Sequence, residues 1–296
     1  DGLEVRHRAA LKYLRGEMFR QNDQPKKALS EWTWVSKARD RLYSTKARLA
    51  KTMLELSEEI ITSEEALDRL ENNMRFAWRD DGLETQILQN IGMLRIKTGH
   101  YYDGLVQLKD TIRLASYNLI DTDLIVADMT SIFRHLFVDG SAQNIPALEA
   151  ITIYNEFPEL MPSGKDGVKA ALNFAEYLVR VDLLDKAAQA IEDVLKRRDI
   201  DSAQVPVIGA RLAAIYLLDD EPNKAISALQ RTGRKSTPKK LYEERQLLRA
   251  RALSQLDMMN EAIAVLEDMD SADADRLRAD IYWRAQQWEK SAIALF

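Results

Sequence analysis

Apolar residues recur every three or four positions along most of this chain, which is the spacing of one face of an α-helix. In residues 42–61 these positions are Leu49, Met53, Leu54, Leu56, Ile60 and Ile61. Residues 183–195, 205–218 and 241–256 show the same spacing. No run alternates apolar and polar residues between turn signals, so the pattern predicts an all-α protein without a sheet.

Residues that favour helix starts fall between these segments. Thr62 and Glu65 have the spacing of a capping box, in which each side chain satisfies a free N–H of the first helical turn. Proline is tolerated at a helix start because its missing N–H costs least there. Five prolines stand where we expect helices to begin: Pro25, Pro146, Pro206, Pro222 and Pro238.

A set of four residues with constant internal spacing recurs six times along the chain. A small residue is followed by a second, usually larger member three positions on, another small residue twelve on and a bulky apolar residue sixteen on. The sets are Gly16/Phe19/Ala28/Trp32, Gly92/Arg95/Gly104/Leu108, Ala175/Leu178/Ala187/Ile191, Ala213/Tyr216/Ala225/Leu229, Ala250/Leu253/Ala262/Leu266 and Ala279/Tyr282/Ser291/Leu295. This spacing predicts pairs of helices that approach closely at the small residues. Because one pair cannot bury both of its apolar faces, we expect the pairs to stack on their neighbours.

The pattern resembles the tetratricopeptide repeat (TPR) family, whose signature places a small residue and an aromatic on a first helix, then Ala and a bulky residue on a second. The resemblance is closest at Leu212-Ala213…Tyr216…Ala225…Leu229 and at Ile91-Gly92…Gly104…Leu108, and it covers about residues 8–118 and 168–296. It implies an α-solenoid, a right-handed superhelix of about seven to eight stacked antiparallel helix hairpins.

The chain departs from the family pattern in places, so we interpret it as a divergent member. The second hairpin keeps Ala66 and Leu70 but has Leu54 where a small residue is expected, and the fourth, near 121–158, lacks the spacing. We therefore expect hairpins 1–3 in residues 1–118 and a divergent hairpin that acts as a joint in 119–167. Hairpins 5–8 occupy 168–296, the last of them truncated. One continuous solenoid is the expectation, and a domain boundary at the joint is the alternative.

Composition narrows the class of protein further. The 296 residues include no cysteine, which excludes disulfides, thiolate catalysis and sulfur-bound metal. The missing cysteine slightly favours an oxidising compartment, the bacterial periplasm, with the cytoplasm as the alternative. No apolar run reaches the roughly 18 residues of a membrane span, so we expect no membrane insertion by this segment. The chain starts without Met and stops within its last hairpin, which suggests a fragment of a larger, bacterial protein.

Charge is unevenly distributed but does not indicate nucleic-acid binding. Residues 1–51 carry 13 Lys/Arg and 6 Asp/Glu, a net charge of +7, whereas the remainder carries 29 and 41, a net charge of −12. Solvated helix faces account for this asymmetry, although an interaction surface would as well. A basic loop contains Arg231, Arg234, Lys235, Lys239 and Lys240. In an acidic chain without a larger basic stripe we interpret it as a solvated loop, and we expect no nucleic-acid partner.

The motifs of common enzymes are missing. The three histidines are far apart, and the chain contains no H-E-x-x-H, P-loop, G-x-G-x-x-G, G-x-S-x-G or calcium-loop motif. We therefore predict no catalytic, cofactor-binding or metal-ligating residue, and no enzyme activity. Trp32 falls at the bulky position of its set, and we expect most of Trp34, Trp78, Trp283 and Trp288 to be buried as well.

The resemblance also suggests a binding surface, because in this family the first helix of each pair lines a concave groove that holds peptides or partner helices. Projecting that register onto this chain predicts nine partner-binding residues: Gln86, Gln89, Lys169, Glu176, Arg180, Arg251, Arg276, Asp280 and Arg284.

The function we predict is a non-enzymatic scaffold or adaptor that binds a peptide or partner protein in this groove. One alternative is a structural segment that self-assembles in a larger complex, which leaves homo-oligomerisation open. Another is the targeting arm of a larger enzyme whose catalytic domain lies outside this segment.

Overall fold

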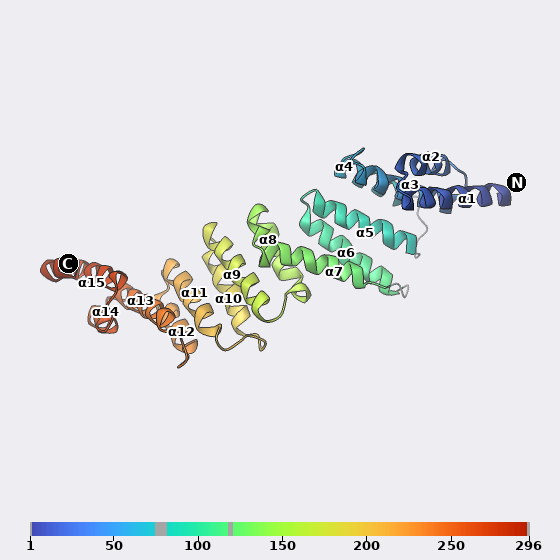
Figure 1. The fold of residues 1–296 in the computed structure, drawn as a ribbon. Coiled ribbons are helices and arrows are strands. Elements are labelled where there is room, and N and C mark those ends of the chain that lie inside the picture. The colour runs from blue at the N-terminus through green and yellow to red at the C-terminus, as the bar shows by residue number, and fades with distance from the viewer. Residues whose placement is uncertain (1, 75–81, 118–120, 295–296) are drawn as a thin grey trace. The chain divides into compact units, whose positions relative to one another are not determined.

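The computed structural model describes residues 2–74, 82–117 and 121–294. In these residues the chain forms sixteen α-helices and three short irregular helices (Figure 1), which confirms the all-α prediction. The α-helices are α1 (Gly2–Gln21), α2 (Pro25–Val35), α3 (Arg41–Ser57), α4 (Ser63–Met74), α5 (Gly82–Lys97), α6 (Tyr101–Tyr117), α7 (Asp123–Phe133), α8 (Ala147–Glu156), α9 (Gly164–Arg180), α10 (Leu184–Leu195), α11 (Val205–Leu218), α12 (Pro222–Arg231), α13 (Lys239–Gln255), α14 (Met259–Leu266), α15 (Ala272–Arg284) and α16 (Trp288–Ile293). The irregular ones are η1 (Arg134–Val138), η2 (Ser141–Asn144) and η3 (Pro158–Leu160).

Helix starts agree with the sequence signals. Pro25 and Pro222 begin α2 and α12, and the other three prolines lie within one residue of a helix start. The capping box before α4 is also formed. The Thr62 N–H donates to Glu65 Oε2 over 3.1 Å, and the Glu65 N–H donates to Thr62 Oγ1 over 3.2 Å.

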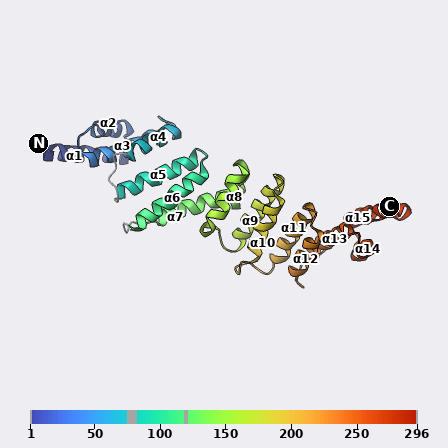
Figure 2. The same cartoon turned by 180° about the vertical axis from the view of Figure 1, so that it is seen from behind.

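Sequential helices pack as antiparallel pairs (Figures 1 and 2). In the described residues the pairs are α1–α2, α3–α4, α5–α6, α9–α10, α11–α12, α13–α14 and α15–α16. The second helix of a pair packs on the first helix of the next pair, as α10 does on α11 and α12 on α13. This is the stacked-hairpin architecture that the recurring set predicts.

Each of these pairs turns through one residue in the left-handed region, with φ between 53° and 90°. These residues are Asp23, Glu59, Gly99, Asp182, Asp220, Asp257 and Gln286. The next N–H then donates to the carbonyl five residues back, as Leu183 does to Leu178 over 2.9 Å, which is the hydrogen bond of a Schellman helix end. In the six sets the acceptor is the second member of the set. The constant spacing in the sequence therefore marks the geometry of the turn.

Small residues occur where two helices of a pair touch. A Cβ atom on Gly16 would lie 2.2 Å from Nε1 of Trp32, and one on Gly104 would lie 2.7 Å from the Gly92 carbonyl oxygen. Trp32 is fully buried, and its Nε1 donates to the Tyr13 carbonyl over 3.2 Å. A larger residue at either glycine would force the helices apart.

The second hairpin keeps a small residue on α3, but not at the position that the sequence pattern indicated. Its left-handed residue is Glu59, and seven positions before it stands Thr52, which is 5% exposed. Ala66 follows Glu59 by seven positions, whereas Ala28 follows Asp23 by five, so this turn is two residues longer. Our placement of Leu54 at the small position was therefore wrong. Leu54 belongs to an apolar cluster that includes Trp32.

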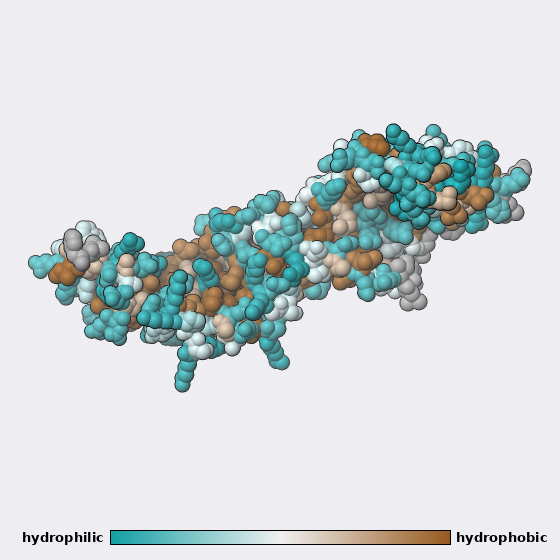
Figure 3. Space-filling model, viewed as in Figure 1, coloured by the Kyte–Doolittle hydropathy of each residue, from teal (hydrophilic) through white to brown (hydrophobic). Residues whose placement is uncertain are grey.

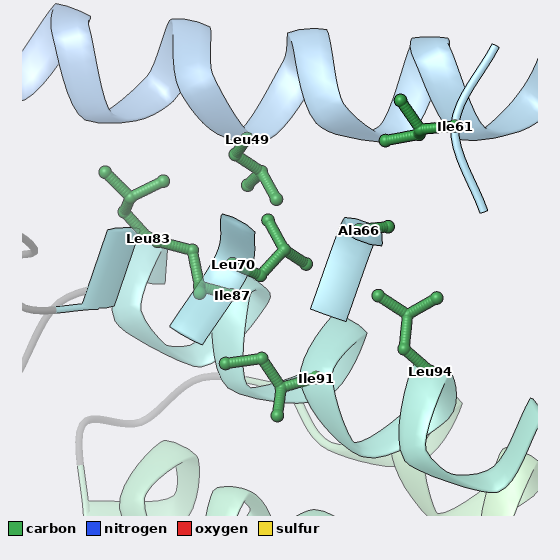
Figure 4. Packing of buried hydrophobic residues seen from close by; sticks show 8 residues of the cluster. All are labelled: Leu49, Ile61, Ala66, Leu70, Leu83, Ile87, Ile91 and Leu94. Atoms are coloured by element: carbon green, nitrogen blue, oxygen red, sulfur yellow. The ribbon is translucent and has the colours of Figure 1, made fainter. Parts of the chain in front are cut away.

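The chain divides into two compact units. Unit 1 comprises residues 1–131 and 151–156, and unit 2 comprises 132–150 and 157–296. The core of unit 1 includes a cluster from α3, α4, α5 and the turn before α4, shown in Figure 4. A second cluster in unit 2 joins α13, α14 and α15. The role of residues 119–167 as a joint stays a prediction.

Part of the divergent segment supports α9, the first helix of its pair. The Phe137 ring lies 4.6 Å from that of Phe133 and 5.3 Å from that of Phe174 on α9. Asn173 on α9 donates to the Phe137 and Val138 carbonyls over 3.1 and 2.8 Å. These contacts hold α9, the helix at which the regular pairs of unit 2 begin, although the divergent segment itself lacks the recurring set.

Candidate groove in unit 2

A groove of about 610 Å³ lies across three successive first helices of unit 2, namely α11, α13 and α15. Neighbouring members of this series contact one another directly. Its lining comprises Ala214, Leu217, Leu218, Leu248, Arg251, Ser254, Gln255, Asp273, Arg276, Leu277, Asp280 and Arg284. In the view of Figure 3, apolar side chains of unit 2 gather over α9 to α11 among polar ones.

The helix register explains which residues line the groove. The first small residue of each set (Ala213, Ala250, Ala279) is buried against its own pair, so the next position turns toward the groove. That position holds Ala214, Arg251 and Asp280. One helical turn later, five positions after the small residue, come Leu218, Gln255 and Arg284. The groove is therefore lined by two rows of side chains that cross the helices.

The floor of the groove is apolar. Leu248 and Leu277 are buried there, whereas Leu218 is 63% exposed. An exposed leucine beside charged groups is an anchor point for an apolar side chain of a ligand, since covering a leucine is worth about 1.5–3 kcal/mol.

The rim carries three arginines and two aspartates with different pairing. Arg276 lies 3.8 Å from Asp273, and Arg284 lies 3.2 Å from Asp280, each pair within α15. Such exposed pairs are worth about 0–1 kcal/mol, so a ligand can displace them at little cost. Arg251 on α13 is exposed and makes no hydrogen bond or ion pair with any residue that the structure describes.

A second groove, of about 880 Å³, crosses α1, α3 and α5 in unit 1. Its polar lining includes Glu17, Arg20, Lys46 and Gln86, and its apolar lining includes Leu49 and Leu54. Tyr13 also lines it. Burial, together with the nearby Glu17 carboxylate, raises the pKa of the Tyr13 phenol to about 12.

The nine residues projected from the sequence are distributed unequally. Arg251, Arg276, Asp280 and Arg284 come together in the groove of unit 2, and Gln86 lines the groove of unit 1. The remaining four, Gln89, Lys169, Glu176 and Arg180, line neither groove.

Two different causes separate those four residues from the grooves. Gln89 donates to Asp128 Oδ2 on α7 over 3.3 Å, so its side chain is engaged within unit 1. Lys169, Glu176 and Arg180 are exposed on α9, which is the first helix of the pair that precedes α11 and α12. They extend the same face beyond the groove.

Our projection missed the apolar floor and several polar lining residues of the unit 2 groove. These are Ala214, Leu217, Leu218, Leu248, Ser254, Gln255, Asp273 and Leu277. Applying the positions one and five after the small residue to every set would have found Ala214, Leu218 and Gln255. Our projection selected mainly charged residues. The register decides which positions face the groove whatever residue stands there, so uncharged residues at the same positions were left out.

Three tryptophans correct the expectation that most of them are buried. Trp32 is buried as expected, but Trp34, Trp283 and Trp288 are 39%, 61% and 52% exposed. Trp34 has the Arg8 guanidinium and the Lys12 ammonium each 5.2 Å from its ring, and the Trp283 and Trp288 rings meet edge to face at 4.5 Å. The Trp34 contacts join α1 to α2, and the contact of Trp283 with Trp288 joins α15 to α16, so these rings pack between the two helices of a pair but stay partly exposed. Trp78 lies outside the described residues.

The described residues form neither a metal site nor a membrane span. Within residues 2–74, 82–117 and 121–294, no three His, Asp or Glu side chains come together in a way that could hold a metal ion. None of the helices in the described part of the chain is both long and apolar enough to cross a membrane. All five cations of the basic loop are exposed, as expected.

Comparison with known proteins supports the fold class. No protein-family model matches the chain, and no curated protein matches it either. A chain in the structure of Naa15/Naa10 bound to HypK-THB has a TM-score of 0.53 at 13% identity; the match covers 97% of this chain and 41% of that one. This chain thus spans well under half of the matched protein. The TPR2AB domain of yeast Sti1, in complex with pHSP90, matches with a TM-score of 0.41 at 13% identity, covering 96% and 98% of the two chains. A tetratricopeptide repeat protein from Parabacteroides merdae matches with a TM-score of 0.30 at 19% identity, covering 85% and 90%.

The helix pairs, their turns and the similarity to the chain in the Naa15/Naa10 structure define the class of fold. The chain is a divergent TPR-like array of antiparallel helix pairs.

Proposed function

We propose that this chain is a non-enzymatic scaffold or adaptor that binds a segment of another polypeptide in the groove of unit 2. The observation that carries the proposal is the groove itself, in which an exposed Leu218 on α11 shares the lining with charged side chains on α13 and α15. A surface that combines an apolar floor with a polar rim suits a peptide, because side chains cover the floor while the rim contacts the polar backbone.

Stacked pairs also suit this role mechanically. The core of the array lies within each pair and between neighbouring pairs. Because the side chains of Arg251 and Leu218 are exposed, the core does not depend on them. Binding of a ligand would then bury surface that folding leaves uncovered.

The test is selection from a random-peptide display library on the purified chain. We expect enriched peptides whose affinity falls about 10- to 100-fold in Leu218→Glu, because the variant loses an apolar contact and places a charge on the floor. Ile293→Glu is the control, since Ile293 is 75% exposed on α16 and does not line the groove. Peptides that bind Leu218→Glu as well as the parent protein would show that the groove is not the binding site.

A further inference from the structure

A small polar pocket of about 260 Å³ lies in unit 1, where the end of α2 meets α3 and α4. It shares no lining residue with either groove. Ser36 lines it at the end of α2, and α3 and α4 each contribute residues at positions i, i+3 and i+4, which lie on one helix face. These residues are Arg48, Lys51 and Thr52 on α3, and Arg69, Asn72 and Asn73 on α4. Every described residue of the lining is therefore polar or charged.

Positive charge is in excess in the polar pocket. Among the described residues, no Asp or Glu lines it, and one carboxylate beside it serves two of its cations. Lys51 Nζ lies 3.7 Å from Glu55 Oε1, and Arg69 Nη1 lies 2.5 Å from Glu55 Oε2. Glu55 thus balances one of these two charges, and Arg48 adds a third cation to the lining. An anion in the pocket would complete the balance and accept charge-assisted hydrogen bonds from these groups.

The pocket also contains a buried acceptor. Asn73 is 2% exposed, and its Nδ2 donates to the Thr45 carbonyl over 3.2 Å, which fixes the orientation of the amide. Its Oδ1 accepts no hydrogen bond from any residue that the structure describes. A buried amide oxygen without a donor is unfavourable. A ligand that fits this pocket therefore brings both negative charge and a hydrogen-bond donor.

We propose that the polar pocket binds a phosphate group together with a hydroxyl, the phosphate at Lys51 and Arg69 and the hydroxyl at Asn73 Oδ1. Hydrogen phosphate supplies both, because it keeps one O–H at neutral pH. A small phosphate ester with a hydroxyl on its organic part supplies the same groups. The volume of the pocket lies below the roughly 300–1,000 Å³ of pockets for drug-sized ligands, so it suits an ion or a small ester.

The experiment compares three small anions of equal charge by isothermal titration calorimetry at pH 8 and constant ionic strength. Inorganic phosphate keeps an O–H under these conditions. Sulfate has none, and neither has methyl phosphate, because the second pKa of a phosphate ester is about 6. We expect inorganic phosphate to bind about tenfold more tightly than the other two, since only it can donate to Asn73. Equal affinity for all three anions would overturn the proposal and show a general attraction of anions.

A fourth titration distinguishes the two sources of the phosphate group. Glycerol 3-phosphate carries its hydroxyls on the organic part. If it binds more tightly than inorganic phosphate, the pocket takes an ester. If it binds more weakly, the pocket takes free phosphate.

Two variants separate the charge from the acceptor. Lys51→Gln should weaken the binding of all these anions about tenfold, because a charge-assisted hydrogen bond is lost. Lys46→Gln is the matched control, since Lys46 is a lysine on the same helix that does not line the polar pocket. Asn73→Leu keeps a similar side-chain shape and removes the acceptor. It should reduce the affinity for phosphate to that for sulfate and leave sulfate binding unchanged.

Each variant can also contradict the proposal. Equal weakening by Lys51→Gln and Lys46→Gln would mean that anions respond to the overall charge of the region and occupy no defined pocket. A phosphate preference that survives in Asn73→Leu would show that Asn73 does not recognise the hydroxyl. Circular dichroism checks that this variant folds without the bond to Thr45, and the comparison of anions on the parent protein does not depend on it. None of these results bears on peptide binding in unit 2, because the polar pocket and that groove share no lining residue.

Discussion

The grooves of unit 1 and unit 2 are built on the same element, the first helix of each pair, and they differ in chemistry. In unit 1 the lining arginine, Arg20, lies 3.1 Å from Glu17 on its own helix, and the lining leucines Leu49 and Leu54 are buried. In unit 2, Arg251 is unpaired and Leu218 is exposed.

The comparison shows that the repeat determines how the helices pack, whereas the residues at the outward positions can differ between the units. Small residues and the left-handed turn hold the helices in register in both units. The outward positions do not contribute to that packing, so they can change without loss of the fold. We therefore expect unit 2 to be the better binding site although its groove is smaller, because its Arg251 has no partner among the described residues and its Leu218 is exposed.

The largest expected effect comes from opening a helix pair in unit 1. Gly16→Ala places a methyl group against the buried Trp32, and we expect a loss of about 1–3 kcal/mol in the stability of this region. Hydrogen exchange should show faster exchange in α1 and α2 and no change in α11–α16, because pairs in an array contact only their neighbours.

Met18→Ala is the control for this change, since Met18 is an exposed residue of the same helix. It should leave the exchange of α2 unaltered. Faster exchange in α13–α15 of the Gly16→Ala protein would show that the two grooves are not independent.

A smaller effect is expected from acid on unit 2. Asp199 accepts hydrogen bonds from the Arg197 guanidinium, over 2.7 and 3.0 Å, and from the Gly164 N–H over 2.9 Å. These bonds favour the ionised form and lower the pKa of Asp199. Its contribution to stability is therefore present above the unfolded pKa of about 3.9 and is lost as the pH falls below it.

Asp199→Asn should lower the melting temperature at pH 7 and reduce the further decrease on acidification to pH 3. Circular dichroism at several pH values measures both effects. Asp268→Asn serves as the control, because Asp268 is exposed. Equal acid sensitivity of the Asp199→Asn and parent proteins would mean that this contact does not stabilise unit 2.

The smallest effect concerns two phenols, one in each unit. Burial raises the pKa of Tyr216 to about 12, with the Glu192 carboxylate as the next cause, which parallels Tyr13 in unit 1. The folded protein thus keeps protons that the unfolded chain releases above pH 10, so stability declines as the pH rises from 10 through 12.

Ultraviolet titration of the ten tyrosines should show a late-ionising fraction. Tyr13→Phe and Tyr216→Phe should each remove part of that fraction. If both variants leave the late fraction unchanged, these two phenols are not the protected ones.

Much of the fold could be predicted from the sequence, because the interface of a helix pair requires residues of particular size. Gly16 and Trp32 are complementary in volume, and that complementarity is visible as spacing. The register of the second hairpin could not be read in this way. Its turn is two residues longer than in the six sets, and the small position before Glu59 holds Thr52, so the constant spacing does not apply there.

The candidate site was predicted only in part, for a related reason. Register alone placed Arg251 and Asp280 on the lining of the groove, because both follow a small residue of the set. Gln89 satisfied the same kind of projection, yet it bonds to Asp128 on α7, which belongs to the segment without a recurring pattern. Contacts with irregular neighbours are absent from a periodic description of the sequence.

The left-handed turn residue also bears on how such a chain can change in length during evolution. Inserting one residue between Ala175 and Ala187 would displace Asp182 from the turn and rotate one helix of the pair against the other. An insertion in residues 196–204, between two pairs, would leave both pairs in register. Insertions and deletions should therefore accumulate in the connections between pairs, which are unequal in length in this chain already.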